Sequence, residues 1–469
     1  LKGVVQVFVN QVIPSNNQPW TKRPPQFMTG TGFIVDLRLR IIATNAHCVE
    51  FAKTILLRKT GDAEKHEAHM LAINHQCDLA FLTVPDDAFW VGAVPIEIGE
   101  MPRMQQKVDV VGYPIGGDTV SITSGVVSRI DWQPYSQSGG EKYLCVQVDA
   151  SINPGNSGGP ALSNGKLVGV AFQGMRMANN IGYIIPISIF KCMMSNFNEC
   201  AETAVMVRQF ARFSPKCQSA ENPYIRRSVS LPTTESGIIV RAVPKLSNLH
   251  GVFLKNDILV AVDGVNVEND GRICFPPLQP ISFQHIVTSK LVGDPVHYTI
   301  YRDGERKEIT CVAENPKRRI PLISKSPFVS FAMFAGFVFL PVFNEGGTDV
   351  TDMYSSRMEK KNIEHLHESD QCVVLTSVLP HSIGIGYDET GMYMPLYKVN
   401  DQEIRNIFDV AMAISSTEGE MITFEFVTDE CIVLPYKKGI EATLQIQEDY
   451  GMASVVSADI LDVLIKAGK

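Results

Sequence analysis

The chain lacks the cysteine pattern of a disulfide scaffold or a zinc module. Its ten cysteines are spread along 469 residues, with no Cys-x-x-Cys pair and no clustered ligand spacing. This distribution favours reduced, mostly buried thiols in a reducing compartment or organelle. Because residue 1 is leucine rather than methionine, we expect residues to precede it, and the compartment stays open.

Long hydrophobic runs are also missing. The longest, residues 327–343, has about 17 residues and is interrupted by Ser330, Gly336 and Pro341, whereas a membrane helix needs about 20. We therefore predict buried strands here and no membrane span. A protein tethered to a membrane by this run is the less favoured alternative.

No sign of charge dominates the chain. It has 42 Lys and Arg against 50 Asp and Glu, a net charge of −8, so it lacks the basic footprint of a nucleic-acid binder. With 45% hydrophobic and 20% charged residues, it is typical of folded proteins. Its length predicts about three domains.

The first predicted segment, residues 1–198, contains many short runs of β-forming residues separated by Gly, Pro and Asn. Val5, Val7 and Val9 alternate with Gln6 and Phe8, as in a strand. Many short strands with regular turn signals indicate an all-β barrel or sandwich. A short helix over 187–197 closes the segment, and residues 199–233 form a connector with helical spacing over 200–213.

Two α+β segments follow, at 234–315 and 320–469. The first contains strands over 237–240 and 257–262, a helix over 282–291, and two strands flanking Asp303-Gly304, a strong hairpin signal. The second loosely repeats that order, with Val399-Asn400-Asp401 in place of Val262-Asp263-Gly264. This is a degenerate internal repeat with a C-terminal extension.

Three motifs in the first segment carry chemistry. His47 follows a predicted strand, Asp78 precedes an apolar strand, and Ser157 lies in the glycine-rich run Asn153–Pro160. Each alone is more often structural, as a core histidine, a cap and a turn serine. Together, in this order, they are the parts of an acyl-transfer site: a serine nucleophile, a histidine base and a carboxylate that orients it.

The same glycine run predicts an oxyanion hole. Gly155 and Ser157 would donate their backbone amides, with Asn156 in the turn between them. Gly158 and Gly159 would let the chain pass close beneath the nucleophile. Scans for a zinc-binding HExxH helix, a P-loop and a dinucleotide turn fail, so no cofactor and no metal are predicted.

The motifs Gly30–Phe33, Thr44–His47, Cys77–Ala80 and Gly155–Pro160 resemble the HtrA/Deg (DegP-like) serine protease family. Further stretches that resemble its plant-type Deg subgroup are Val111–Asp118, Thr123–Ser128 and Gly182–Pro186. The resemblance implies a mainly β chain: a chymotrypsin-like double β-barrel protease domain at 1–198, then PDZ domains at 234–315 and 320–469, the second strongly modified.

From this resemblance, His47 is implied as general base, Asp78 as its orienting acid and Ser157 as nucleophile. The substrate pocket is implied near Ser151, Ile152, Val170, Ala171, Phe172 and Gln173, for which ordinary strand core is an equal alternative. Branched apolar walls favour small to medium aliphatic residues before the scissile bond. Cys48 lacks the disulfide partner found in secreted trypsin-like enzymes, so we expect a free thiol.

The resemblance also implies regulation and assembly. Residues 11–29 would form a regulatory loop, with sensor and activation loops at 130–141 and 174–180. In the first PDZ domain Gly237, Ile238 and Ile239 would bind a peptide carboxylate beside the 282–291 helix. In the second, an aromatic group would serve subunit assembly, with core packing a close alternative: Phe331, Phe334, Phe337, Phe339 and Phe343.

The predicted function is ATP-independent serine endopeptidase activity on unfolded or damaged proteins, with peptide C-termini or internal segments bound by PDZ domains. We expect a homo-oligomer built from trimers, a hexamer or larger. The alternative is a chaperone-like holdase or PDZ scaffold in which proteolysis is minor. The intact set of His47, Asp78 and Ser157 favours the enzyme.

Overall fold

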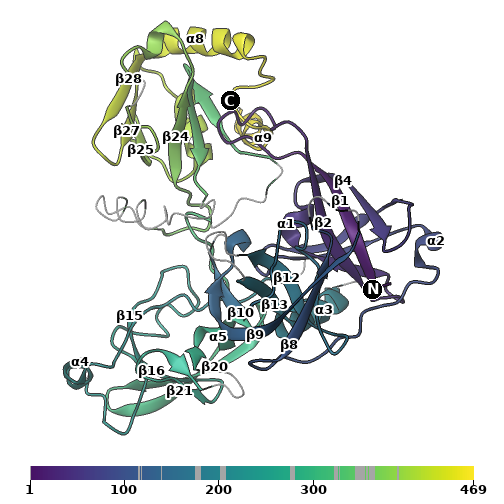
Figure 1. The fold of residues 1–469 in the computed structure, drawn as a ribbon. Helices are drawn as coiled ribbons and strands as arrows, with labels where there is room; N and C mark the ends of the chain where they lie inside the picture. The colour runs from purple at the N-terminus through teal and green to yellow at the C-terminus, as the bar shows by residue number, and fades with distance from the viewer. Residues whose placement is uncertain are drawn as a thin grey trace. The chain divides into compact units, whose positions relative to one another are not determined.

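The computed structural model (Figure 1) describes residues 2–114, 117, 119–138, 140–174, 181–200, 208–274, 280–321, 326, 328–343, 354, 358, 365–387 and 390–468. The chain forms two compact units. Unit 1 comprises Leu1–Gln11 and Gln26–Pro316, and unit 2 comprises Val12–Pro25 and Lys317–Lys469. The segment expected as a regulatory loop of the protease domain therefore belongs to unit 2 for residues 12–25.

A seven-stranded antiparallel sheet opens unit 1, in the order β5-β4-β1-β2-β3-β7-β6. Strand β1 is central and buried on both faces, because Val5, Val7 and Val9 enter an apolar core while Gln6 and Phe8 are covered opposite. In the described residues β5 and β6 end the sheet, so hydrogen bonding does not close it into the expected first barrel. The elements are β1 Val4–Gln11, β2 Gln26–Asp36, β3 Ile41–Thr44, α1 Ala46–Val49, β4 Ala52–Lys59, β5 His66–Glu67, β6 His69–Asn74, β7 Leu79–Thr83 and α2 Asp87–Trp90.

The next six strands form a closed barrel, in the order β10-β13-β12-β11-β8-β9. Its interior holds Val110, Val146, Val170 and Ile185, all almost fully buried. The expected closing helix is present and longer than predicted. The elements are β8 Lys107–Gly112, β9 Ser121–Pro134, η1 Ser136–Ser138, β10 Lys142–Val148, β11 Pro160–Ser163, β12 Lys166–Gly174, β13 Gly182–Pro186 and α3 Ile187–Cys200.

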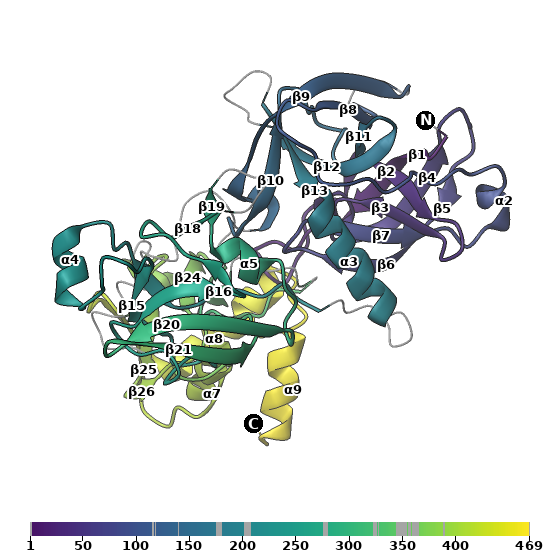
Figure 2. The same cartoon turned by 90° about the horizontal axis from the view of Figure 1, so that it is seen from below.

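A second sheet of unit 1 follows, in the order β14-β15-β16-β20-β21, with β17 paired to β16. Its helix α5 contacts barrel strand β10 (Figure 2), and both share one continuous apolar core. The predicted strands, helix and Asp303-Gly304 hairpin are confirmed. The elements are β14 Lys216–Gln218, α4 Pro223–Ser228, β15 Ile238–Ala242, β16 Ile258–Val262, β17 Val265–Asn266, β18 Arg272–Ile273, β19 Ile281–Ser282, α5 Gln284–Thr288, β20 Pro295–Arg302 and β21 Glu305–Val312.

The helical spacing predicted over 200–213 falls partly outside the described residues, which omit 201–207. The described part, 208–213, is extended rather than helical, so the prediction is wrong there. Phe210 bridges to Leu291 in antiparallel fashion, and burial of its ring decides the local structure. Within the predicted connector, Asn222-Pro223 starts helix α4, because the Asn222 side chain accepts from the Tyr224 amide and proline takes the first turn.

Unit 2 contains two small sheets, β22-β23-β24 and β26-β25-β27-β28. Helix α7 covers them, and α8 and α9, which the sequence analysis missed, follow. The elements are β22 Ala332–Phe334, β23 Phe337–Pro341, β24 Val373–Val378, η2 Ser382–Gly384, β25 Leu396–Val399, β26 Gln402–Glu403, α7 Ile407–Ser415, β27 Met421–Phe426, β28 Cys431–Pro435, α8 Tyr436–Asp449 and α9 Ala458–Lys466.

The predicted repeat is confirmed by equivalent hairpins and helices. Val262 pairs with Val265 across one tight turn, and Val399 pairs with Gln402 across the other. Asp263 and Asn400 both take positive φ there, 46° and 52°, as such turns require. A helix and a two-stranded hairpin follow in each case.

The aromatic group of unit 2 is core, not an assembly surface. Phe331, Phe334, Phe337 and Phe339 are at most 4% exposed and pack within their own domain. The assembly role favoured for these four side chains is therefore wrong. In the described residues, no helix combines the length and apolarity that a membrane crossing requires.

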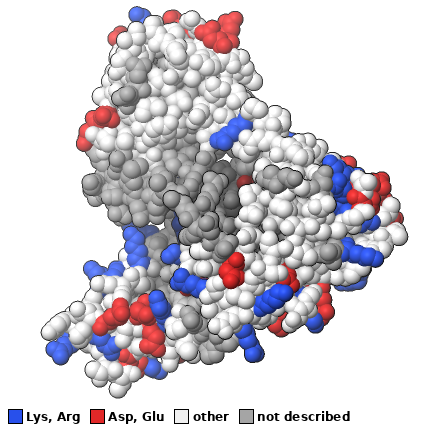
Figure 3. All heavy atoms as spheres, viewed as in Figure 1, with Lys and Arg blue, Asp and Glu red and all other residues white. Residues whose placement is uncertain are grey.

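Figure 3 shows the charged side chains on one face of the molecule. Lys and Arg side chains alternate there with Asp and Glu rather than gathering into one basic track. Sequence-independent binding to a phosphate backbone depends on such a track.

Candidate active site

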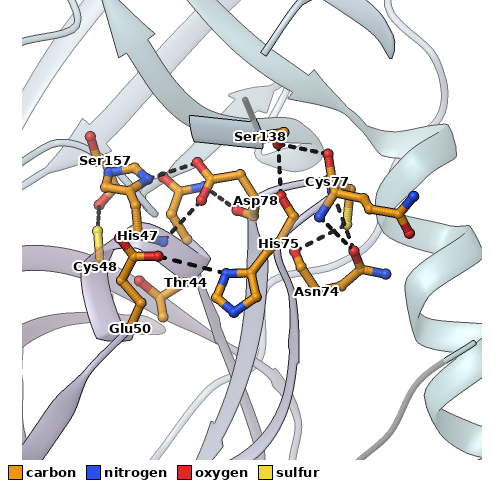
Figure 4. Close-up of polar contacts among 12 residues, drawn as sticks. Thr44, His47, Cys48, Glu50, Asn74, His75, Cys77, Asp78, Ser138 and Ser157 are labelled. Atoms are coloured by element: carbon orange, nitrogen blue, oxygen red, sulfur yellow. Dashed lines mark hydrogen bonds and ion pairs between the residues drawn. The ribbon is translucent and has the colours of Figure 1, made fainter. Parts of the chain in front are cut away.

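His47 and Asp78 come together where strand β3 ends and its neighbour β7 begins. Strand β3 ends at Thr44, and the short helix α1 then presents His47. One carboxylate contacts this histidine twice: the His47 amide donates to Asp78 Oδ1 at 2.9 Å, and His47 Nδ1 lies 2.7 Å from Asp78 Oδ2 (Figure 4). The second contact fixes the ring so that Nε2 is left for another partner.

The Asp78 backbone is held in an unusual conformation. Its φ is 54°, a left-handed value that a non-glycine residue adopts only when its surroundings impose it. The Asp78 carbonyl accepts from the Ala46 amide at 3.2 Å and from Asn45 Nδ2 at 2.9 Å. With the residue 1% exposed, these contacts lock the turn before β7 against α1.

The electrostatic environment favours a charged imidazole. Burial by itself lowers the pKa of His47, but the Asp78 carboxylate, and after it Cys48, outweigh burial. The net pKa of His47 lies well above its ordinary value. An imidazolium formed during a reaction is therefore stabilised here.

Ser157 lies in a turn that packs against α1 and β2. Its carbonyl accepts from the Thr31 amide at 3.0 Å and contacts Cys48 Sγ at 3.7 Å. Cys48 is the neighbour of His47, so the serine turn and the His–Asp pair share one site (Figure 4). In the described residues the Ser157 hydroxyl makes no hydrogen bond to His47; such contacts are often long before substrate binds.

Glycine at 158 is required by close packing. Its φ is +83°, and a Cβ there would lie 2.2 Å from the Thr31 carbonyl oxygen and 2.4 Å from Thr44 Oγ1. A Cβ at Gly159 would lie 2.2 Å from the Val111 carbonyl oxygen. These approaches are what the glycine pattern predicts.

The predicted oxyanion turn has a defined shape. The Asn156 amide donates to Asn153 O at 3.0 Å, and Thr31 Oγ1 donates to Gly155 O at 2.7 Å. Across the described chain, neither the Gly155 amide nor the Ser157 amide donates to a protein acceptor. Thr31 was missed as a site residue, although it lies inside the quoted motif Gly30–Phe33; its hydroxyl signals no role without the fold.

The residues implied as substrate pocket lie beside this turn. The Gly158 amide donates to Ala171 O at 2.8 Å, which places strand β12 next to Ser157. Val170, Ala171 and Phe172 are at most 2% exposed, and the Phe172 ring packs on Tyr135 at 4.6 Å. Ile152 is 8% exposed, and the Ser151 carbonyl accepts from Thr123 Oγ1 at 3.0 Å. The side chain of Gln173 lies outside the described residues.

The expected regulatory loops are only partly described. Residues 175–180 of the activation loop and residue 139 of the sensor loop lie outside the described residues. Ser138 of the sensor loop contacts the carbonyls of His75 and Gln76, with its Oγ 2.7 and 2.8 Å from them. This links the sensor loop to the turn that carries Asp78 (Figure 4).

The peptide-binding edge predicted at Gly237–Ile239 is wrong. Strand β15, which holds Ile238 and Ile239, is paired on both sides, with β14 and β16, so no strand can be added to it. The Gly237 amide is also occupied, donating to Asn269 Oδ1 at 3.2 Å. Strand β14, Lys216–Gln218, is the edge; its three residues are exposed, and no strand of the described residues pairs with its outer side.

The described part of the chain contains no cluster of three or more His, Cys, Asp or Glu side chains that could bind a metal ion. The nine cysteines whose side chains are described, Cys48 among them, are free thiols.

Comparison with known proteins covers most of the chain. The trypsin-like peptidase domain matches residues 30–170, and a PDZ domain matches 320–459. Protease Do-like 2, chloroplastic, from Arabidopsis thaliana is 34% identical over 470 residues, which cover 98% of this chain and 76% of that protein. Protease Do-like 4, mitochondrial, from the same plant is 33% identical, with 98% and 85% covered.

The chain belongs to the Do-like (HtrA/Deg) serine protease family. It is accordingly a serine endopeptidase with a trypsin-like domain and a PDZ domain. The solved HtrA-type protease AlgW with tripeptide has 19% identity and a TM-score of 0.51, over 68% of this chain and 95% of AlgW. At that identity the likeness concerns the fold alone.

Proposed function

We propose that this Do-like protease degrades unfolded polypeptides without ATP, by acyl transfer through Ser157, His47 and Asp78. The observation that carries the proposal is the double contact of one Asp78 carboxylate with His47, at 2.7 and 2.9 Å. A carboxylate bound to Nδ1 fixes the tautomer that leaves Nε2 as the base.

The reaction proceeds in two halves. Ser157 Oγ attacks the substrate carbonyl carbon while His47 Nε2 takes the hydroxyl proton, and Asp78 stabilises the imidazolium. The Gly155 and Ser157 amides donate to the oxyanion. His47 then gives its proton to the leaving amine, and water, activated by the same base, releases the acid from the acyl-enzyme.

Substrate selection has two parts in this proposal. Among the residues proposed for the substrate pocket, Ile152, Val170, Ala171 and Phe172 are apolar, which favours aliphatic residues before the scissile bond. An extended peptide adds as a strand to the outer side of β14, since that edge is exposed. We also propose that the chain forms homo-oligomers built from trimers.

The deciding experiment is intact-mass labelling with a fluorophosphonate. Wild type should gain one adduct, whereas Ser157→Ala and His47→Ala should gain none, because the residues act as one unit. Retained labelling or cleavage in Ser157→Ala would refute the assignment. If cleavage is lost while Ser157→Ala still binds unfolded protein, a holding role exists beside proteolysis.

The pH profile tests the role of Asp78. The base acts when neutral, and its pKa is raised, so kcat/KM should rise with pH through a midpoint above 6.5. Asp78→Asn should lower kcat by about 10⁴-fold and move that midpoint down. A wild-type midpoint at or below 6.5 would contradict the proposed electrostatics.

A further inference from the structure

Gln76 forms a two-point join between the catalytic half of unit 1 and its connector. Gln76 Nε2 donates to the Phe210 carbonyl at 3.2 Å, and the Phe210 amide donates to Gln76 Oε1 at 2.9 Å. The Gln76 side-chain amide thus hydrogen-bonds to both the N–H and the C=O of Phe210, as the backbone of a neighbouring strand would. Phe210 itself is fully buried, with its ring packed edge-on against Tyr143 at 5.9 Å.

On one side, this join is continuous with the turn that carries Asp78. Asn74 Oδ1 accepts from the amides of Gln76 and Cys77, at 2.9 and 3.4 Å. The Gln76 carbonyl contacts Ser138 Oγ at 2.8 Å, and Cys77 is fully buried. Asp78 follows directly, in its left-handed conformation. A turn held in such a conformation depends on contacts of this kind.

On the other side, the join is continuous with the sheet that bears the β14 edge. The Ala211 amide donates to the Lys290 carbonyl, and the Val292 amide to the Gln209 carbonyl, both at 2.8 Å. Phe213 then packs edge-on against Phe283 at 5.1 Å. Strand β14 begins three residues later, at Lys216.

We propose that Gln76 is a positioning residue for proteolysis. Its side-chain amide holds the Asn74–Asp78 turn in place against Phe210 and thereby aligns the Asp78 carboxylate with His47. This inference rests on the proposed roles of these two residues. Gln76 touches neither substrate nor reacting atoms. It acts through the backbone conformation of the turn two residues before Asp78.

The chain offers a matched control on the same connector. Asn196 of helix α3 makes the same pair of contacts with Arg208, donating to its carbonyl at 2.9 Å and accepting from its amide at 3.1 Å. Asn196 is fully buried. Its helix reaches the catalytic turn at Met193, whose Sδ lies 4.0 Å from Cys77 Sγ, but the two hydrogen bonds that the control variant removes go to Arg208. Removing either pair loosens the connector, but of the two pairs only that of Gln76 involves a residue of the turn that carries Asp78.

The experiment compares Gln76→Met with Asn196→Leu, which keep side-chain bulk and remove the hydrogen bonds. The readouts are kcat and KM on a fluorogenic aliphatic peptide, corrected for active sites by fluorophosphonate titration, and the acid limb of the pH profile. We expect Gln76→Met to lower kcat by about ten- to hundredfold, as small misplacements do, with KM little changed.

The pH profile separates positioning from mere support. Loosened alignment weakens the effect of Asp78 on His47, so the acid limb of Gln76→Met should move to lower pH. Asn196→Leu should lower thermal stability but keep the wild-type kcat per active site and acid limb. Wild-type kcat and acid limb in Gln76→Met, or equal losses in both variants, would overturn the inference.

Two further outcomes keep the test decisive. If Gln76→Met does not fold, Gln76→Glu replaces it, since it keeps an acceptor for the Phe210 amide and loses the donor. A wild-type kcat per active site in that variant would overturn the inference, and a reduced one supports it. If the fluorophosphonate does not label wild type at Ser157, the proposed function fails. If it labels wild type and the Gln76 variant equally fast, only the proposed role of Gln76 fails.

Discussion

The second sheet region of unit 1 (residues 208–315) and unit 2 share an order of elements but differ at their exposed edges and in their cores. In unit 1 the edge strand β14 is open on its outer side within the described residues. In unit 2 the edge strand β22 is covered by the chain itself: the Met333 amide donates to Val455 O at 2.8 Å, and the Ser457 amide to Phe331 O at 3.0 Å. Within the described residues, β14 therefore keeps an open outer side, whereas the outer side of β22 is paired.

The apolar cores of the two regions also differ. The first region shares one apolar cluster with the closed barrel, so Phe253 and Val146 belong to the same core. Unit 2 has clusters of its own, one of which includes Trp20 from the Val12–Pro25 segment. We therefore expect the first region to unfold with the catalytic barrel and the second to unfold by itself.

The largest effect should come from truncating one buried phenylalanine in each region. Phe253→Ala and Phe424→Ala should each cost about 3–5 kcal/mol, because both rings are at most 2% exposed within aromatic clusters. Differential scanning calorimetry combined with fluorophosphonate labelling at rising temperature would test the comparison. Phe253→Ala should lower the temperature at which labelling is lost.

Phe424→Ala should leave that temperature unchanged and lower only a separate transition. If both variants shift the same transition, the two units unfold together and the comparison fails.

Acid should destabilise the first region through His285. Burial lowers the pKa of His285 to about 4, so the folded state holds this side chain neutral. The unfolded state takes up a proton near pH 6.5, so stability falls as pH decreases from about 6.5 to below 4, by up to about 3 kcal/mol. Urea titrations of wild type and His285→Phe at several pH values would measure it.

If the free energy of unfolding of His285→Phe falls with decreasing pH as steeply as that of wild type, the acid sensitivity comes from other groups.

A smaller effect is expected for Trp20. Its ring packs against Phe331 at 6.0 Å and edge-on against Tyr450 at 6.1 Å. Trp20→Ala should destabilise unit 2 by about 2 kcal/mol, since the ring is only partly buried and such aromatic pairs add about 0.5–1.5 kcal/mol each. Trp20→Phe serves as the conservative control.

The calorimetric transition assigned by Phe424→Ala is the readout. A shift of the labelling temperature instead would mean that residues 12–25 stabilise unit 1.

The smallest effect concerns the covered edge of unit 2. Ser457 Oγ accepts from the Phe331 amide at 3.1 Å, and Ser457→Ala would leave that buried amide without this acceptor. We expect a loss of about 1–2 kcal/mol in unit 2 and faster hydrogen exchange at Phe331 and Met333. Unchanged exchange would show that the edge is protected by other contacts.

Local patterns sufficed for much of this molecule. Alternating valines predict β1 and Asp303-Gly304 predicts a hairpin, because both depend on short-range chemistry. The order His47, Asp78, Ser157 predicts a protease because each residue lies in a recognisable local motif. Which strand lies at the edge of a sheet depends on pairing between distant segments, so a local pattern does not predict it. Gly237–Ile239 has the composition of a peptide-binding turn, yet pairing on both sides removes that possibility.

Helix α8 shows a second limit. Gly439 near its start argues against a helix when the sequence is considered alone. In the fold, a Cβ at this position would lie 2.4 Å from the Phe334 ring, so glycine is what permits the ring to pack there. Likewise Gln76 resembles any polar turn residue until Phe210, 134 positions later in the chain, is placed beside it.

Unit 2 is built from two segments that lie far apart in the sequence, and this affects its folding during synthesis on the ribosome. Residues 12–25 leave the ribosome with the first strands of unit 1, but their partners begin about 290 residues later, at Lys317. At about 5–20 residues per second, Phe331 is made about 15–60 s after Trp20, and Tyr450 about 20–90 s after it. Nascent chains should therefore expose this segment to chaperones and proteases long after the strands on either side of it have been made.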